Sequence, residues 1–161
     1  MGGKVLSNFM NCFPGSISRS ADDIVVSLKN QGTAAIEPGE PVFLSADGKG
    51  VTKTQTDSAF SRFVGIAVRI PSATPNVYGE DVRKYEANDP VDVIVRGSVV
   101  VKLENEMADA GGAVHLTLAD GTFTTEAVTD ETIQLANCSW RRSAELGDGC
   151  AEVVIRERNI L

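Results

Sequence analysis

The chain has 161 residues, 42% of them hydrophobic, which is enough apolar material for one domain with its own core. Its 22 acidic and 15 basic side chains give a formal net charge of −7, which argues against nucleic acid and anionic membrane surfaces as partners. The first residues lack the pattern of a secretion signal, and no apolar run approaches the ~20 residues that a membrane helix needs. We therefore expect a soluble protein made in the cytoplasm, with no membrane and no nucleic-acid partner.

The first 20 residues predict an arm, followed by a single β domain over residues 21–161. Apolar side chains recur there at roughly helical spacing, but glycines and the Pro14-Gly15 break oppose a long helix. The arm is either a strap over its own domain or a contact with a neighbouring subunit, because exposed apolar clusters mark contact surfaces. The residues expected to make that contact are Val5, Leu6, Phe9, Met10 and Phe13.

Short strands are predicted in the first half of the chain at residues 24–28, 41–44 and 64–70. Pro71 ends the third strand, because proline cannot continue a sheet ladder. Residues 71–90 contain prolines, a glycine and several acidic side chains, which is typical of a long surface loop.

The clearest β pattern follows that loop, where valines alternate with other residues on both sides of Gly97. This segment is either a hairpin or one long strand bent at Gly97, because a glycine within a strand often marks a bulge or a corner. The alternation predicts that Val93, Val95, Val99 and Val101 are mostly buried.

Further strands are predicted at residues 114–118, 123–125, 132–135 and 151–156. In the last of these, Val153 and Ile155 are expected to point inward, and Glu152 and Arg156 outward. Frequent glycine turns between short strands favour an all-β fold, namely a small antiparallel β-sandwich or β-barrel with a non-regular N-terminal arm.

One motif occurs twice. The sequence GEPVFLSADG at residues 39–48 is echoed by GGAVHLTLADG at residues 111–121, with Leu118 as a single inserted residue. Each copy reads as a turn, a strand and a second turn, in which Asp-Gly tolerates positive φ. The echo favours a fold built from two related hairpins, with chance or shared turn chemistry as the alternative.

The sequence contains little catalytic chemistry. The single histidine, His115, takes the repeat position of Phe43, opposite the strand's main apolar face, and we expect a surface or interface side chain there. No nucleophile-elbow motif supports a Ser-His-Asp triad. The cysteines Cys12, Cys138 and Cys150 are an odd number at spacings that match no zinc or redox motif, so buried or inert thiols are expected.

Glu104, Glu106 and Asp109 cluster before a Gly-Gly pair, but they lack the regular ligand spacing of a calcium loop. A solvated loop is therefore expected at this point. We expect no catalytic residue, no metal and no cofactor. A small hydrolase whose acidic residues meet only in the fold stays as a remote alternative.

Arg141-Arg142 follows Trp140, an arrangement that either stacks on a base or sugar or forms a salt-bridged strand end or subunit contact. Apart from the phenylalanines, the aromatic residues are Trp140, Tyr78 and Tyr85. They are few for a carbohydrate- or cell-surface-binding β module, which is the main alternative function.

From about residue 20 onward, the order of motifs resembles the structural cement, or head decoration, proteins of tailed bacteriophages. The resemblance rests on residues 24–28, 37–42, 63–67, 89–99, 111–114 and 151–153. It implies a small β domain, made in the host cytoplasm, that is added to the outer capsid surface of the virion. Such a protein locks neighbouring subunits of the major capsid protein together. Because cement proteins often share the local symmetry of their binding position, we expect a homotrimer on the capsid.

Overall fold

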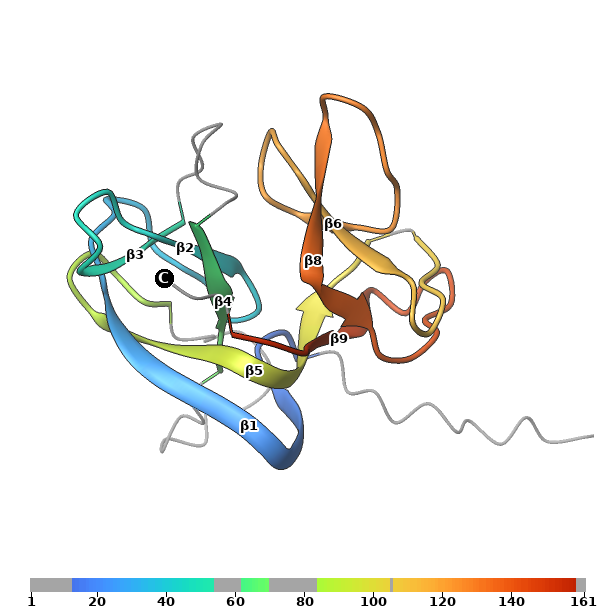
Figure 1. The fold of residues 1–161 in the computed structure, drawn as a ribbon, viewed down its shortest axis with the longest axis horizontal. Coiled ribbons are helices and arrows are strands. Elements are labelled where there is room, and N and C mark those ends of the chain that lie inside the picture. Colours follow the sequence, from blue (N-terminus) through green and yellow to red (C-terminus); the bar gives the residue numbers. More distant parts are fainter. Residues whose placement is uncertain (1–12, 54–61, 70–83, 105, 159–161) are drawn as a thin grey trace, which may run out of the picture.

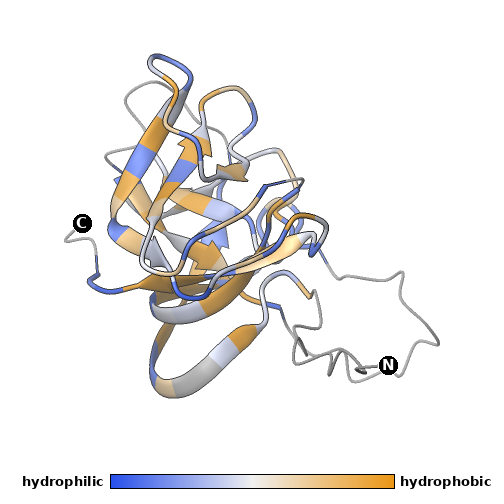
Figure 2. Ribbon diagram, turned by 90° about the vertical axis from the view of Figure 1, so that its right-hand side faces the viewer, coloured by the Kyte–Doolittle hydropathy of each residue, from blue (hydrophilic) through white to orange (hydrophobic). Residues whose placement is uncertain are grey.

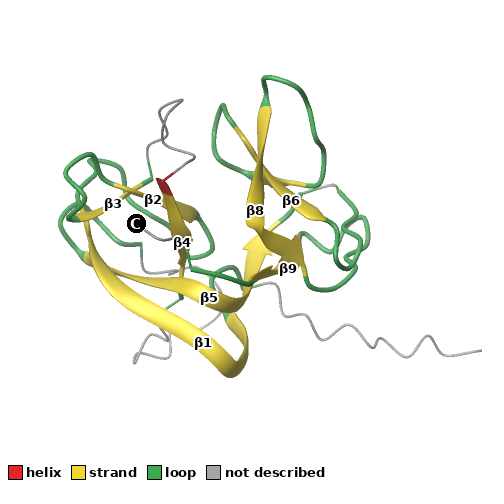
Figure 3. Ribbon diagram, viewed as in Figure 1, coloured by secondary structure: helices red, strands yellow, loops and turns green. Residues whose placement is uncertain are grey.

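The computed structural model describes residues 13–53, 62–69, 84–104 and 106–158, in which regular structure is almost entirely β (Figure 1, Figure 3). The strands are β1 (Ile17–Asn30), β2 (Pro41–Leu44), β3 (Gly50–Thr52), β4 (Phe63–Ala67), β5 (Pro90–Lys102), β6 (Ala113–Thr117), β7 (Phe123–Thr124), β8 (Thr132–Trp140) and β9 (Cys150–Ile155). The expected all-β fold is confirmed. Among the described residues, no helix is long and apolar enough to cross a membrane.

The strands form one sheet in the order β1-β3-β2-β4-β5-β9-β8-β6-β7, and β1 pairs with β5 as well. That extra pairing closes strands β1 to β5 into a barrel, while β6 to β9 extend from the second half of β5. The pairing of β1 with β3 is parallel, and the other strand pairs are antiparallel. Figure 1 shows β6 and β8 beside the barrel rather than within it.

β5 is one long strand with a bend at Gly97, which decides between the two expected alternatives. Gly97 has a φ of 123°, and a Cβ atom at this position would lie 2.2 Å from Asp23 Oδ1. Glycine is therefore required both by the backbone conformation and by the close approach of β1. Strand β5 pairs with β4 before Gly97 and with β9 from Gly97 onward, while β1 pairs with it on both sides of the bend.

Two hydrophobic cores share β5. Val93 and Val95 pack in the barrel core with apolar residues of β2, β3 and β4. Ile94 belongs to the second core, together with Val99 and Val101 from beyond the bend and apolar residues of β6, β8 and β9. The expected burial of all four valines is confirmed, since none is more than 6% exposed. In Figure 2 the strands are largely hydrophobic and most connecting turns are hydrophilic.

We predict that Gly97→Ala lowers the melting temperature by at least about 6 °C, because the methyl group adds a collision with Asp23 to the strain of positive φ. Gly48→Ala is the matched control, since Gly48 has a φ of 72° and no neighbour within 4 Å of an added Cβ. The melting temperature of Gly48→Ala should decrease by about 3 °C, from backbone strain alone. Equal shifts in differential scanning calorimetry would contradict the close packing of β1 on the bend.

The repeated motif is confirmed as a structural repeat. The order β3-β2-β4-β5 in the first unit matches β7-β6-β8-β9 in the second. Each unit contains a strand–turn–strand hairpin, β2–β3 in one and β6–β7 in the other. In the second unit, the part of β5 from Gly97 onward pairs with β9. This part of β5 thus corresponds to β1, which pairs with β5 in the first unit.

The two hairpin turns also use the same hydrogen bonds. Asp47 Oδ1 accepts bonds from the Ser45 hydroxyl at 2.7 Å and the Lys49 amide at 3.1 Å. Asp120 Oδ1 accepts bonds from the Thr117 hydroxyl and from the Thr122 amide, the latter at 3.3 Å. These hydroxyl hydrogen bonds come first among the causes that hold the pKa of both carboxyl groups below its ordinary value.

Candidate functional site

Residues 13–16 are held against the barrel by hydrogen bonds. The Gly15 amide donates to Val100 O at 2.8 Å, and the Val100 amide donates to Ser16 O at 3.0 Å. The Arg69 amide donates to Gly15 O at 2.8 Å. β1 then begins at Ile17, within the stretch that the sequence predicted as an arm. Any contact made by earlier residues therefore starts from a position that is held by the barrel.

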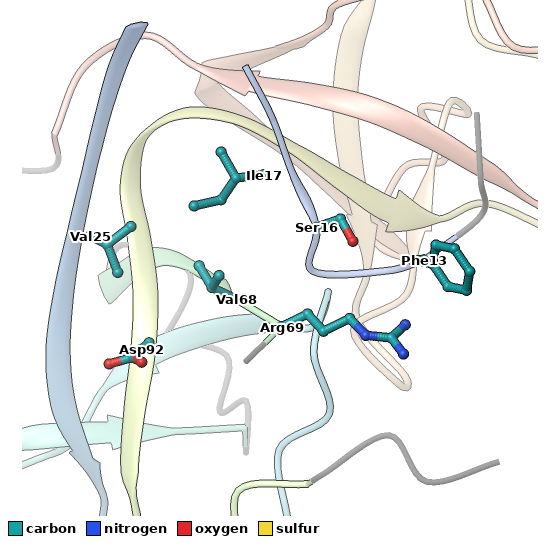
Figure 4. A pocket seen from close by; sticks show the side chains of 7 residues that line it. All are labelled: Phe13, Ser16, Ile17, Val25, Val68, Arg69 and Asp92. Carbon is teal, nitrogen blue, oxygen red and sulfur yellow. The ribbon is translucent and has the colours of Figure 1, made fainter. Parts of the chain in front are cut away.

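An apolar hollow lies beside this point (Figure 4). It is lined by Phe13, Ser16, Ile17, Val25, Val68, Arg69 and Asp92. Phe13, Ile17 and Val25 are exposed, and the Arg69 guanidinium lies 4.8 Å from the centre of the Phe13 ring. Of the five residues expected to contact a partner, Phe13 thus borders an exposed apolar surface. The other four, Val5, Leu6, Phe9 and Met10, lie outside the described residues.

The expected surface position of His115 is wrong. Its side chain is 8% exposed, and its neighbours Val114 and Leu116 are buried as well. Both faces of β6 are therefore covered, which the alternation within one strand does not reveal. His115 Nδ1 is buried without a hydrogen-bond partner among the described residues.

The expected outward position of Glu152 is also wrong, whereas Arg156 is exposed as expected. Glu152 is 2% exposed and lies where β9 pairs with β5. Its Oε1 accepts a hydrogen bond from the Ser18 hydroxyl at 2.6 Å and lies 3.6 Å from Arg141 Nε. A buried carboxylate requires such partners, so the β1 and β8 contacts explain why an acidic residue occupies an inward position.

Cys138 and Cys150 are both buried, which confirms the expected burial for these two residues. Cys12 lies outside the described residues. Burial is the dominant cause that raises the pKa of Cys138 to about 12.

We predict that Cys138 resists iodoacetamide at pH 8 in the native protein, because the reactive thiolate forms only as the pH approaches the raised pKa. Peptide mass spectrometry should detect carbamidomethylated Cys138 only after denaturation. Fast labelling of Cys138 in the native state, at the rate seen in denaturant, would contradict its burial in the second core.

The three acidic residues considered as cation ligands have separate roles. The Glu106 carboxylate accepts hydrogen bonds from Thr124 Oγ1 at 2.8 Å and from the Thr125 amide at 2.6 Å. Glu104 instead forms an ion pair with Lys102 at 2.5 Å, while the Asp109 carbonyl closes a backbone turn. Over the described ranges, no group of three or more His, Cys, Asp or Glu residues is placed to hold a metal ion.

The aromatic residues do not form a surface platform in the described part of the chain. Trp140 and Tyr85 are buried, and the Tyr85 hydroxyl donates to Val68 O at 2.5 Å. Tyr78 lies outside the described residues. Trp140 is therefore not available for stacking on a sugar or base, and Arg141 beside it pairs with Glu152 as a salt-bridged strand end.

A second hollow lies at the ends of β8 and β9, and we call it the arginine hollow. It is lined by Gly111, Ser139, Trp140, Arg141, Arg142, Val154 and Arg156. The side chains of Arg141, Arg142 and Arg156 are all exposed. Sequence reasoning considered the Arg141-Arg142 pair but not Arg156, because the fold alone brings the end of β9 beside β8. The repeated motif predicted a turn at Gly111, but it did not indicate that the three arginines lie beside this turn.

Comparison with known proteins identifies a family. Residues 3–156 match the family described as structural cement protein (E217 gp24/Pam3 gp6). The fold is similar to that of a chain in the solved structure "The capsid of Myoviridae Phage XM1", with a TM-score of 0.66 and 18% sequence identity over 98% of both chains. At this identity the likeness shows a common fold. No curated protein matches the chain.

Proposed function

The chain belongs to the structural cement protein family of phages, and from this premise we propose that it binds the outer surface of a phage head. There it stabilises contacts between neighbouring subunits of the major capsid protein. The observation that carries the proposal is the family match, which extends over residues 3–156 and so includes both units of the repeat. A structural role in the capsid also agrees with the similarity of fold to a capsid chain.

The proposed mechanism is thermodynamic linkage. A protein that binds the assembled lattice but not free subunits stabilises the lattice by its binding free energy, about 2.7 kcal/mol per site at a free concentration of 100 times Kd. Repetition over many sites makes this contribution large for the whole particle. The acidic surface of the chain, with a net charge of −7, favours solubility before attachment.

We propose that residues 1–12 form part of the attachment. They contain Val5, Leu6, Phe9 and Met10, and they could reach up to about 40 Å from Phe13 if extended. Because Gly15 is hydrogen-bonded to the barrel, the chain is held just beyond the C-terminal end of this segment. Binding of the segment therefore costs less conformational entropy than binding of a segment with two free ends. Phe13 and the exposed apolar hollow would continue the same contact surface.

We also propose that three copies assemble on the capsid, because a protein that binds where subunits meet tends to adopt their local symmetry. A particle reconstruction should place the protein on threefold or quasi-threefold positions. Placement away from every such axis would contradict the trimer without contradicting attachment.

Co-sedimentation of the purified full chain with empty mature heads that lack it tests the proposed function. We expect saturable binding and a higher temperature of head disruption in the presence of the protein. Serum albumin is the control for trapping in the pellet. If the chain stays in the supernatant at micromolar concentration, the proposed function is wrong.

A further inference from the structure

The arginine hollow occupies the same place in the second unit as a covered surface in the first. The Gly39 amide donates to Ala67 O at 2.8 Å, and the Gly111 amide donates to Trp140 O at 2.7 Å. The residues that follow Ala67 and Trp140 correspond as well. The Val68 amide donates to Asp92 O in β5, and the Arg141 amide donates to Glu152 O in β9, both at 2.7 Å. Continuing this register makes Arg69 of the first unit equivalent to Arg142 of the second.

In the first unit, this surface is covered by a turn of the chain itself, in which the Ser16 amide donates to Phe13 O at 3.1 Å. The Arg69 amide donates to Gly15 O at 2.8 Å, so a carbonyl group of the N-terminal segment occupies that donor. The segment also lies close to the Gly39 turn, because a Cβ added to Gly39 would be 2.5 Å from Pro14 Cβ. The first unit thus shows that the surface can hold a backbone segment, whose Gly15 carbonyl accepts the Arg69 N–H.

In the second unit, no described residue covers the equivalent surface. A Cβ atom added to Gly111 would meet no atom of the described residues within 4 Å, in contrast to Gly39. Neither the amide nor the guanidinium of Arg142 has a hydrogen-bond partner or an ion pair among the residues that the structure describes. The second unit therefore offers a free backbone donor beside open space.

The lining of the two surfaces differs in charge. The hollow beside the first surface is lined by apolar side chains and by one basic and one acidic residue, Arg69 and Asp92. The second is lined by three guanidinium groups. Arg141 is paired with the buried Glu152 carboxylate, and Arg156 Nη2 donates to Ser139 Oγ at 2.9 Å, which leaves the other donors of Arg156 available. This basic hollow lies on a chain whose net charge is −7.

We propose that the arginine hollow binds a carboxylate-bearing backbone segment of the capsid subunit to which the chain attaches. A carbonyl of that segment accepts the Arg142 N–H, as Gly15 O accepts the Arg69 N–H in the first unit. Its carboxylates pair with the guanidinium groups of Arg142 and Arg156, whose planar geometry suits carboxylate oxygens. The proposal rests on the proposed function, because it names the chemistry of the capsid surface.

The charge of the hollow argues against the N-terminal segment of a second copy as its occupant. Residues 1–12 contain no acidic side chain, and Lys4 adds a positive charge. Placing that segment in the hollow would bring like charges together, which is unfavourable at an interface. An acidic segment instead forms ion pairs with Arg142 and Arg156, and its backbone carbonyl accepts the same Arg142 N–H.

The first experiment compares charge reversals in co-sedimentation with mature heads. Arg142→Glu/Arg156→Glu should weaken binding at least about tenfold and reduce its dependence on salt. The control, Lys29→Glu/Lys49→Glu, makes the same change in net charge at exposed positions outside the hollow and should stay within about twofold of the parent. Melting temperatures of both variants should match the parent. Equal weakening by the two variants would overturn the proposal.

The second experiment separates this inference from the proposed function. In an NMR titration with the peptide acetyl-Glu-Gly-Glu-Gly-Glu-amide, the amide signals of Gly111 and Arg142 should shift, whereas the corresponding lysine peptide should leave them unchanged. This result without any binding to heads would reject the proposed function and keep the acidic ligand. No shift with the acidic peptide would overturn the proposal. Self-association in sedimentation velocity that the double reversal abolishes would assign the hollow to a second copy and overturn the capsid partner.

Discussion

Removal of residues 1–12 is expected to weaken binding to mature heads at least tenfold while changing the melting temperature by no more than about 3 °C. Burial of one large apolar side chain contributes about 1.5–3 kcal/mol, and about 1.4 kcal/mol suffices for a tenfold change in affinity. Part of that gain is lost in ordering the segment. The four large apolar residues within it still leave a net effect that co-sedimentation and calorimetry on the same sample can measure.

The position of the cut matters, because the next residues belong to the barrel. Gly15 and Ser16 share hydrogen bonds with Val100, so removal of residues 1–16 should lower the melting temperature as well as the affinity. A full-length variant with Val5, Leu6, Phe9 and Met10 changed to serine is the matched control for length. Full occupancy by both the shortened chain and the serine variant would reject the attachment role of the segment.

Val93→Asp is expected to lower the melting temperature by about 6–20 °C, because it places an unpaired charge in the barrel core at a cost of about 3–5 kcal/mol. Val101→Asp, in the second core, should cost a similar amount. Since β5 contributes to both cores, each variant should unfold in a single transition that includes both units.

Val128→Asp is the control for these substitutions, because Val128 is exposed on a turn and should tolerate the charge within about 0.5 kcal/mol. Calorimetry on the four proteins checks the expectation. Two separated transitions, with only one of them shifted in each variant, would show that the barrel and the second unit fold independently.

Much of the fold could be predicted from local pattern, because alternation and glycine chemistry act over a few residues. Strand β2 has the predicted bounds, and Gly97 was identified as a bend or turn. The repeated Asp-Gly turns were recognised from the sequence because Asp47 and Asp120 accept hydrogen bonds from residues within a few positions along the chain.

The inaccurate predictions concern contacts between distant segments. β1 is 14 residues long and closes the barrel by pairing with β5 and with β3, which no local pattern encodes. Glu152 was expected on the surface because its burial depends on Ser18 in β1 and on Arg141, which follows β8. His115 was expected at the surface or at an interface, because alternation within one strand does not show that both faces of β6 are buried.

The arginine hollow could not be found from the sequence either. Arg142 and Arg156 are separated along the chain and meet only because β8 pairs with β9. Arg69 and Arg142 are equivalent because the backbone hydrogen bonds beside them correspond, and sequence similarity does not show this equivalence. A repeat of about ten residues indicated two related units, but not that, among the described residues, a covering segment lies on only one of them.

The most direct test of the central claim is a reconstruction of heads that lack the protein, before and after addition of the purified chain. We predict added density on the outer surface, at boundaries between major capsid protein subunits, with the β1–β5 barrel and the second unit both recognisable. The same particles should resist heating to a higher temperature than bare heads. Unchanged density after incubation at saturating concentration, or density confined to the interior of the shell, would contradict a cement function.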